Sequence, residues 1–87
     1  MKITEVIFAA RTQEDKDYWK KKNPKMLERI DKLIADIKRN PFIGLGKPEP
    51  LCFEKTGYWS RRIDHEHRLV YKVVRDRVYI AQCRFHY

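Results

Sequence analysis

The sequence predicts an α+β fold in which two N-terminal helices pack on a small antiparallel sheet, in the order β-α-α-β-β-β. Three observations support this fold class: a β-branched segment at the N-terminus, an amphipathic helical segment after it, and three strand-like segments joined by short polar turns in the second half. With 87 residues, the chain has the size of a single domain spanning residues 1–87.

The first strand and the first helix are expected near the N-terminus. Residues 3–8 alternate weakly and include β-branched and aromatic side chains, which predicts a strand. Residues 10–22 follow as a helix. Its start stays open, because Thr12 and Asp15 form only an imperfect capping box and the helix can begin two residues earlier. Tyr18 and Trp19 are expected to bury its end.

The second helix has clear signals at both ends. Asn23 is expected to accept a hydrogen bond from an N-terminal amide, and Pro24 suits the first turn. Asn40 and Pro41 end the helix after Arg39, since the residue before proline avoids the α region. Apolar residues recur at steps of three and four, which predicts a stripe that packs in the core rather than in a partner's groove: Met26, Leu27, Ile30, Leu33, Ile34 and Ile37.

The second half of the chain begins with a loop and continues as strands. Residues 41–56 are rich in glycine and proline, which predicts a long ordered loop. Loops of this length in a small domain are usually functional. Strands are expected at residues 58–63, 67–74 and 78–86.

The length of the last turn decides which side chains share a face of the sheet. A two-residue turn would set Arg68 against Cys83 and bring charge into the core. We therefore expect a three-residue turn at 75–77. It directs an apolar set toward the helices: Leu69, Tyr71, Val73, Tyr79, Ala81, Cys83 and Phe85. It gathers a basic, hydrogen-bonding set on the opposite face: Arg68, Lys72, Gln82, Arg84 and His86.

The turn at residues 64–66 adds two side chains to the basic face. Three turn residues place Ser60 and Arg62 beside Arg68, and direct Trp59 and Ile63 toward the helices. Arg61 does not fit this pattern, because its position faces the core. It either snorkels at the sheet edge or is displaced by a bulge. The register thus favours a cluster of four residues: Arg62, Arg68, Arg84 and His86.

Charge and cysteine usage narrow the class of protein. Lys and Arg number 20 against 12 Asp and Glu, a net charge of +8, so the surface attracts polyanions, with nucleic acid as the first candidate and a merely well-solvated surface as an equal alternative. No apolar run is long enough for a signal peptide or a membrane span. Cys52 and Cys83 lack zinc-site or disulfide spacing, which favours a reducing, bacterial-type cytoplasm with Cys83 as a core residue.

Three residues supply the groups that metal-free cleavage of an RNA phosphodiester needs. His86 can donate a proton, Glu49 can accept one, and Arg68 can hold the phosphate between them. Pro48 and Pro50 stiffen the backbone on both sides of Glu49, which helps to hold a carboxylate in place. A lone loop glutamate is more often a solvated charge, and a terminal histidine more often has no catalytic role.

A resemblance to a known family changes this balance. Motifs along nearly the whole chain resemble the YoeB (Txe) branch of the RelE-type toxins, the ribosome-dependent endoribonucleases of bacterial toxin–antitoxin pairs. They are Trp19, the segments 40–42 (NPF), 46–51 (GKPEPL), 57–63 (GYWSRRI) and 66–71 (EHRLVY), and the C-terminal 83–87 (CRFHY). Their order and spacing are highly specific. The family's small α+β fold agrees with the elements predicted above.

The resemblance implies roles for individual residues. The catalytic residues map onto Glu49, Arg68, His86 and Tyr87, and the RNA-binding or phosphate-binding residues onto Lys47, Arg62 and Arg84. The expected reaction is cleavage of messenger RNA in the ribosomal A site by attack of a ribose 2′-hydroxyl, with no metal or cofactor. Cys52 departs from the family pattern, because a basic residue often stands there and one phosphate contact is lost.

The resemblance also implies partners. We expect a cognate antitoxin of the YefM or Axe type, the 70S ribosome with its messenger RNA, and operator DNA only through the antitoxin complex. No membrane partner is expected, and a homodimer is left open. The main alternative is a noncatalytic RNA-binding or ribosome-binding module, which would not need Glu49. A DNA-binding protein is less favoured, because no helix-turn-helix is apparent.

Overall fold

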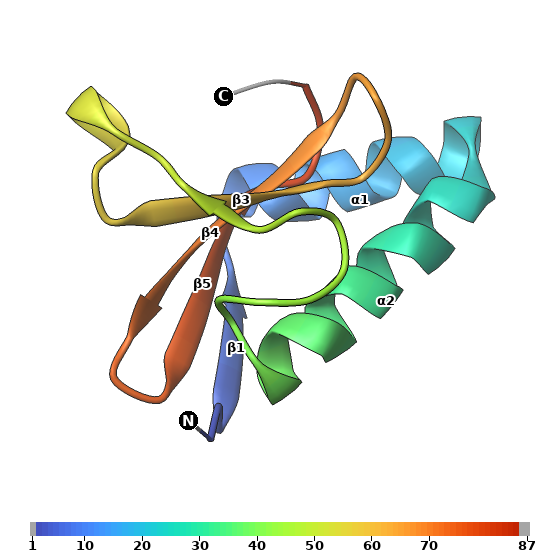
Figure 1. Cartoon of the computed structure of the whole chain (residues 1–87). Coiled ribbons are helices and arrows are strands. Elements are labelled where there is room, and N and C mark those ends of the chain that lie inside the picture. The colour runs from blue at the N-terminus through green and yellow to red at the C-terminus, as the bar shows by residue number, and fades with distance from the viewer. Residues whose placement is uncertain (1, 86–87) are drawn as a thin grey trace.

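Five strands and two helices make up the computed structural model of the protein, which describes residues 2–85 (Figure 1). In chain order the elements are β1 (Glu5–Phe8), α1 (Ala10–Lys22), α2 (Pro24–Arg39), β2 (Glu49–Pro50), a 3₁₀ turn (Phe53–Lys55), β3 (Tyr58–Arg62), β4 (Arg68–Val74) and β5 (Arg77–Gln82). The strands lie in the order β1-β5-β4-β3-β2. The predicted α+β architecture is confirmed. The sheet is mixed, because β1 runs parallel to β5 while all other pairs are antiparallel.

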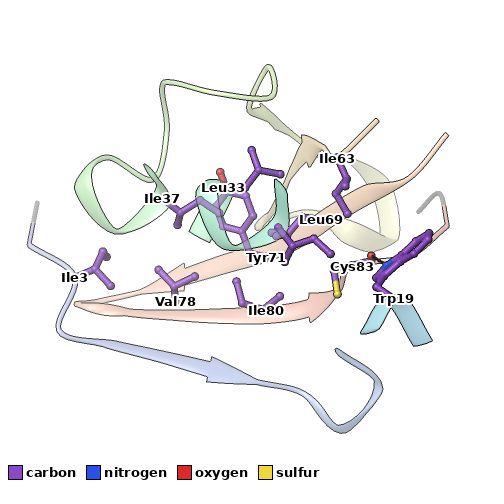
Figure 2. Close-up of a cluster of buried hydrophobic side chains, with 11 residues drawn as sticks. Ile3, Trp19, Leu33, Ile37, Ile63, Leu69, Tyr71, Val78, Ile80 and Cys83 are labelled. Carbon is purple, nitrogen blue, oxygen red and sulfur yellow. Dashed lines mark hydrogen bonds between the residues drawn. The ribbon is translucent and has the colours of Figure 1, made fainter. Parts of the chain in front are cut away.

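The core lies between α2 and the helix-facing side of the sheet (Figure 2). Ile30, Leu33 and Ile37 are fully buried, and the remaining stripe residues pack partly buried against them, so the predicted packing role of this stripe is confirmed. The sheet contributes Leu69, Tyr71, Val78, Ile80 and Cys83, all without exposed surface. Neither helix in the described part of the chain is long and apolar enough to cross a membrane.

Helix α1 begins at Ala10 without a side-chain cap, so Thr12 and Asp15 do not form a capping box. Both are buried against β5 instead. Thr12 Oγ1 donates to the Ile80 carbonyl at 2.6 Å, and Asp15 Oδ2 accepts the Cys83 amide at 3.1 Å. Trp19 Nε1 adds a hydrogen bond to the Cys83 carbonyl at 2.9 Å. Helix α1 therefore holds the end of β5 in place.

The start of α2 also differs from expectation. Pro24 occupies the first turn as predicted, but Asn23 makes no side-chain capping hydrogen bond. Its backbone carbonyl instead accepts the Met26 amide at 2.9 Å. The helix is therefore stabilised mainly by burial of its apolar stripe rather than by a cap.

The predicted register of the last two strands is wrong. Val74 pairs with Arg77, so the turn between β4 and β5 has two residues, and Tyr71 pairs with Ile80. Tyr79 and Ala81 therefore do not belong to the helix-facing set. An irregularity between Val70 and Tyr71 shifts the pairing by one residue, so that Val70 faces Gln82. This bulge returns Cys83 to the core, and it avoids the burial of charge that a regular two-residue hairpin would cause.

Candidate active site

The predicted catalytic face is the side of the sheet that faces away from the helices. Strand pairing aligns Glu49 with Ser60, Ser60 with Val70 and Val70 with Gln82, which forms one row across four strands. The neighbouring row pairs Arg62 with Arg68. Directly paired residues point to the same face, and successive rows on one face are about 7 Å apart. The structure thus brings Glu49, Arg62 and Arg68 onto one face.

Glu49 lies in a short edge strand, although the sequence predicted a loop throughout residues 41–56. Backbone pairing with β3 fixes this segment, and the Leu51 amide extends it with a hydrogen bond to the Tyr58 carbonyl at 2.9 Å. Glu49 is exposed at the edge, whereas Ser60 and Val70 in the middle of its row are buried. The carboxylate is therefore carried on a fixed backbone and remains accessible to solvent.

Arg68 is held by the turn that precedes β4. Its Nη1 donates to the carbonyls of Asp64 at 3.1 Å and of His67 at 3.2 Å. Its Nε and Nη2 donate to no residue within 2–85. The half-buried guanidinium is thus oriented through one nitrogen, and two others could contact an anion.

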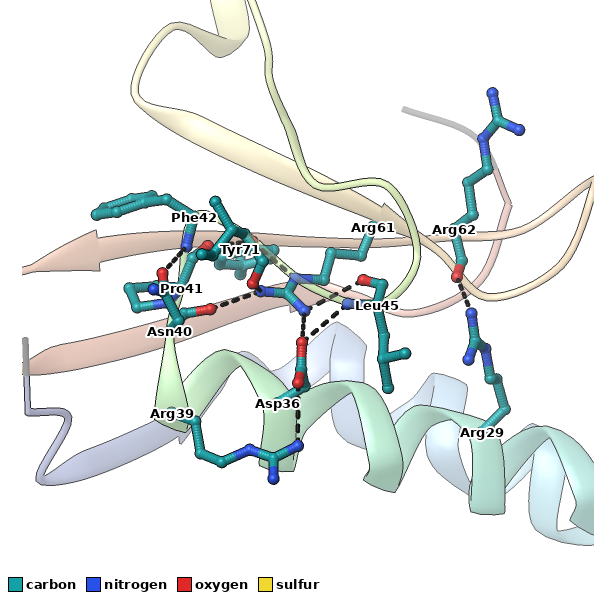
Figure 3. A network of polar contacts seen from close by, with 11 residues as sticks. Arg29, Asp36, Arg39, Asn40, Pro41, Phe42, Leu45, Arg61, Arg62 and Tyr71 are labelled. Carbon is teal, nitrogen blue, oxygen red and sulfur yellow. Dashed lines mark hydrogen bonds and ion pairs between the residues drawn. The ribbon is translucent and has the colours of Figure 1, made fainter.

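Arg62 and Lys47 add positive charge beside this face. The Arg62 amide donates to the Gly46 carbonyl at 2.6 Å, which joins the start of the Lys47 segment to β3. Both Arg62 and Lys47 have exposed side chains, and Figure 3 shows the Arg62 guanidinium directed away from α2. Together with Arg68, these residues place three cationic side chains on neighbouring segments.

Arg84, which the predicted register placed in a cluster with Arg68, has its guanidinium packed against two aromatic rings. Its guanidinium carbon is 3.4 Å from the ring centroid of Tyr18 on α1 and 4.2 Å from that of Phe85. Regular strand structure ends at Gln82, so strand alternation no longer determines the direction of the Arg84 side chain. Arg84 therefore packs against the first helix and fixes the C-terminal segment there.

The predicted catalytic residues His86 and Tyr87 lie outside the described residues. The last described residue, Phe85, is anchored by its backbone. Its amide donates to His67 Nδ1 at 2.8 Å, and its carbonyl accepts the Arg68 amide at 3.0 Å. The described chain therefore ends in contact with the residue that carries the central guanidinium of the face.

Reasoning from the sequence missed His67. It is buried, with 8% of its surface exposed, and its ring packs edge-on against Trp19 at a centroid distance of 4.8 Å. A signal was present in the alternation of this strand, because residue 67 has the same parity as the core residues 69 and 71. A histidine at a core-facing position next to Arg68 needs a polar partner.

Arg61 is fully buried and does not snorkel at the sheet edge (Figure 3). Its guanidinium pairs with Asp36 and donates to three loop carbonyls and one hydroxyl: Leu45, Asn40, Ile43 and the Tyr71 side chain. The hydrogen bond from the Leu45 amide to Asp36, followed by the Arg61 contact, lowers the pKa of the Asp36 carboxyl below its ordinary value. The loop of residues 40–46 is thus wrapped around one guanidinium.

Gly44 shows how closely this loop packs. Its φ is +127°, and a Cβ there would overlap the Asp36 carboxylate. The loop continues through Gly46 and Lys47 to Glu49. The buried Arg61 network therefore also fixes the approach to the candidate catalytic carboxylate.

The two cysteines lie in different environments, which gives a first prediction. Burial raises the pKa of the Cys83 thiol to about 12, whereas Cys52 is exposed. Iodoacetamide at pH 8 is therefore expected to label the folded protein once, at Cys52. Mass spectrometry would measure the labelling, with Cys52→Ser expected to remove it. Labelling of Cys83 under native conditions would contradict the buried thiol.

The described residues of this face offer two chemical functions toward a phosphate. A carboxylate can accept a proton, and guanidinium groups can stabilise an anion. Within residues 2–85, no three His, Cys, Asp or Glu side chains gather in a way that could hold a metal ion.

Similarity to known proteins identifies the family. A family model described as a YoeB-like toxin of bacterial type II toxin–antitoxin systems matches residues 8–87. The chain belongs to this family. The toxin is 52% identical to Toxin YoeB of Streptomyces coelicolor, over 100% of both chains.

Solved structures agree with this assignment. The YoeB/ParE toxin from Agrobacterium tumefaciens superposes with a TM-score of 0.93 at 44% identity, over 97% of this toxin and 100% of that chain. A YoeB dimer from Staphylococcus aureus gives 0.89 at 42% identity, with 100% of both chains covered. A heterotetrameric YoeB–YefM toxin–antitoxin complex from the same species gives 0.88 at 42% identity, again over 100% of both chains.

Proposed function

We propose that this toxin is a ribosome-dependent endoribonuclease that cleaves messenger RNA in the ribosomal A site and so inhibits translation in the bacterial cytoplasm. One observation carries the proposal. In a YoeB-like toxin, a carboxylate at Glu49 shares a sheet face with guanidinium groups at Arg62 and Arg68. An acceptor for a proton beside donors for a phosphate is the arrangement that internal attack on a phosphodiester requires.

The proposed reaction begins at the ribose. Glu49 takes the proton of the 2′-hydroxyl, and the 2′-oxygen attacks the adjacent phosphorus. Arg68, assisted by Arg62 and Lys47, stabilises the charge that develops on the phosphate oxygens, for which guanidinium groups offer paired donors. The bond from phosphorus to the 5′-oxygen then breaks. The products are a 2′,3′-cyclic phosphate and a 5′-hydroxyl.

Two further roles fall to the C-terminal residues. His86 donates the proton that the departing 5′-oxygen needs, and Tyr87 stacks on a base or orients the phosphate. In the sequence His86 follows Phe85, whose carbonyl accepts the Arg68 amide, so the proposed general acid comes directly after a residue in contact with Arg68. Arg84 is assigned to holding the C-terminal segment rather than to binding RNA, because its guanidinium lies on Tyr18.

The 2′-hydroxyl is the group to test. A ribosome-bound message with a single deoxy sugar at the scissile nucleotide is expected to resist cleavage at that site, because the nucleophile is missing. Primer extension would measure cleavage. A deoxy sugar at the following nucleotide is the control and is expected to leave cutting intact.

Two results would argue against the mechanism in different ways. Undiminished cutting of the deoxy message would contradict internal attack and favour water as the nucleophile. Tight binding of the toxin to ribosomes, with no cutting of either message, would support a noncatalytic ribosome-binding module.

The proposed partner in the resting state is a cognate antitoxin. A solved YoeB–YefM complex from Staphylococcus aureus supports this choice, and the toxin's net charge of +8 suits an acidic or amphipathic segment that folds on binding. Contact with operator DNA would then occur through the antitoxin. Self-association into a dimer is a separate expectation, supported by the Staphylococcus aureus YoeB dimer. Light scattering of the purified toxin would test it.

A further inference from the structure

The end of β5 leaves a backbone amide that the sheet cannot pair. Regular strand structure stops at Gln82, and Phe85 adopts a φ of +68°, a conformation that bulky residues rarely adopt. The amide of Phe85 is satisfied by a side chain instead, namely His67 Nδ1 at 2.8 Å. This hydrogen bond determines which nitrogen of the His67 ring carries a proton. Nδ1 carries no proton, so the imidazole is neutral and its proton is on Nε2.

His67 is itself fixed from several directions. Asp64 Oδ1 accepts the His67 amide at 2.6 Å, and the His67 carbonyl accepts the amide of Ile63 at 3.0 Å. The ring packs edge-on against Trp19, which is tied to the Cys83 carbonyl. Its Nε2 lies 3.6 Å from a carboxylate oxygen of Glu66. The acceptor nitrogen therefore has little freedom to turn away from Phe85.

We propose that His67 is a positioning residue, whose neutral Nδ1 fixes the Phe85 amide beside Arg68 and thereby fixes the point from which the proposed catalytic residues His86 and Tyr87 continue the chain. The catalytic part of this inference rests on the proposed function, because it assumes that His86 is the general acid. The same turn also supplies the carbonyls that orient Arg68. One short segment therefore fixes both the Arg68 guanidinium and the Phe85 backbone.

Two substitutions of His67 distinguish the role of its hydrogen-bond acceptor from the role of its aromatic ring. Asparagine at position 67 can place an amide oxygen near the position of Nδ1 but removes the aromatic ring. Phenylalanine keeps a ring against Trp19 but removes the acceptor. If His67 served only for packing, His67→Phe would be the milder change. If the hydrogen bond to Phe85 is what matters, His67→Asn is the milder one.

The expected kinetic result follows from misplacement of the general acid. His67→Phe is expected to lower kcat for cleavage of ribosome-bound message by about 10- to 100-fold with little change in KM, since displacement by about 1 Å can cost that much. His67→Asn is expected to stay within about threefold of the wild type, because the acceptor is retained. A more active Phe than Asn variant would overturn the proposal.

Two measurements on the free toxin do not depend on cleavage. Amide hydrogen exchange at Phe85 is expected to be faster in the Phe variant than in the wild type, and slow in the Asn variant. In the wild type, nitrogen chemical shifts of the His67 ring are expected to show an unprotonated Nδ1 and a protonated Nε2. A proton on Nδ1 of the wild type at neutral pH would overturn the inference even if neither variant folded well enough for kinetics. Equal Phe85 exchange in two variants that are both folded would overturn it as well. Absence of cleavage by the wild type would instead remove the proposed function and leave these two measurements valid.

Discussion

Glutamine in place of Glu49 is expected to lower the rate of message cleavage by about 10²- to 10⁴-fold, the usual contribution of a general base. The amide has nearly the same shape as the carboxylate but cannot take the 2′-hydroxyl proton. Because the side chain is exposed and its segment is held by backbone pairing, the fold should tolerate the change. Primer extension on translated messages would measure the rate, and thermal unfolding would show that the variant is intact.

Glu54→Gln provides a matched control. Glu54 is also exposed and lies on the 3₁₀ turn that follows β2, so its replacement removes the same charge from the same region. Cleavage by this variant is expected to stay within about twofold of the wild type, since a small change in a screened surface charge has little effect. If both variants lost activity equally, the effect would be one of charge. If Glu49→Gln kept more than a tenth of the wild-type rate, Glu49 would not be the base.

The pairing of Arg62 with Arg68 could be predicted from the sequence because it depends on one local turn. Three polar residues at 64–66 fix the β3–β4 register, and alternation along each strand then determines the face. The wrongly predicted length of the β4–β5 turn did not affect this pair, because neither residue lies on β5. Helix α2 was likewise predictable, because its apolar period and the Asn-Pro boundaries at both ends are local signals.

The β5 bulge and the short strand β2 could not be predicted in the same way. A bulge adds one unpaired residue, and the gain comes from returning Cys83 to a core built by distant elements. In β2, Glu49 lies between two prolines, which normally argue against a strand, and only the pairing with β3 reveals one. The position of Arg84 also depends on a distant element and so could not be predicted locally, because an aromatic ring on α1 positions its guanidinium.

Arg61 is the residue whose contacts the sequence pattern indicated least. Strand alternation correctly put this residue on the core side, but no local signal indicated how a guanidinium could be accepted there. Its partners come from the end of α2, from the following loop and from β4, between 10 and 25 residues away in the sequence. A buried charge of this kind is tolerated only when all these partners are in place.

Asp36→Asn is therefore expected to destabilise the protein by about 3–5 kcal/mol, the usual cost of removing one partner of a buried ion pair. Arg61 has no exposed surface, so its charge would lose its counterion without gaining water. The Leu45 amide, which donates to the same carboxylate at 2.9 Å, would be weakened as well. Urea unfolding would measure the free energy. A loss below about 1 kcal/mol would mean that the loop carbonyls alone stabilise the guanidinium.

Arg39→Ala separates the buried pair from an exposed one. Arg39 also contacts Asp36, at 3.0 Å, but its side chain is 76% exposed. Its removal is expected to cost less than about 1 kcal/mol, as is typical of surface ion pairs. A loss equal to that of Asp36→Asn would show that the carboxylate acts through Arg39 instead of through Arg61.

The pH dependence of unfolding gives an independent check on the same carboxylate. The Leu45 amide and Arg61 lower the pKa of Asp36 in the folded state, so the unfolded state binds the proton more readily. The stabilising contribution is then fully present above the unfolded pKa of about 3.9 and is lost as the pH falls through the lower folded value. The amide that replaces the carboxyl in Asp36→Asn cannot titrate, so the difference in unfolding free energy between wild type and this variant should be constant from pH 7 to about 5 and should narrow below about 4. A difference that stayed constant down to about pH 2 would mean that Asp36 titrates alike in both states, and that its contact with Arg61 does not favour the charged form.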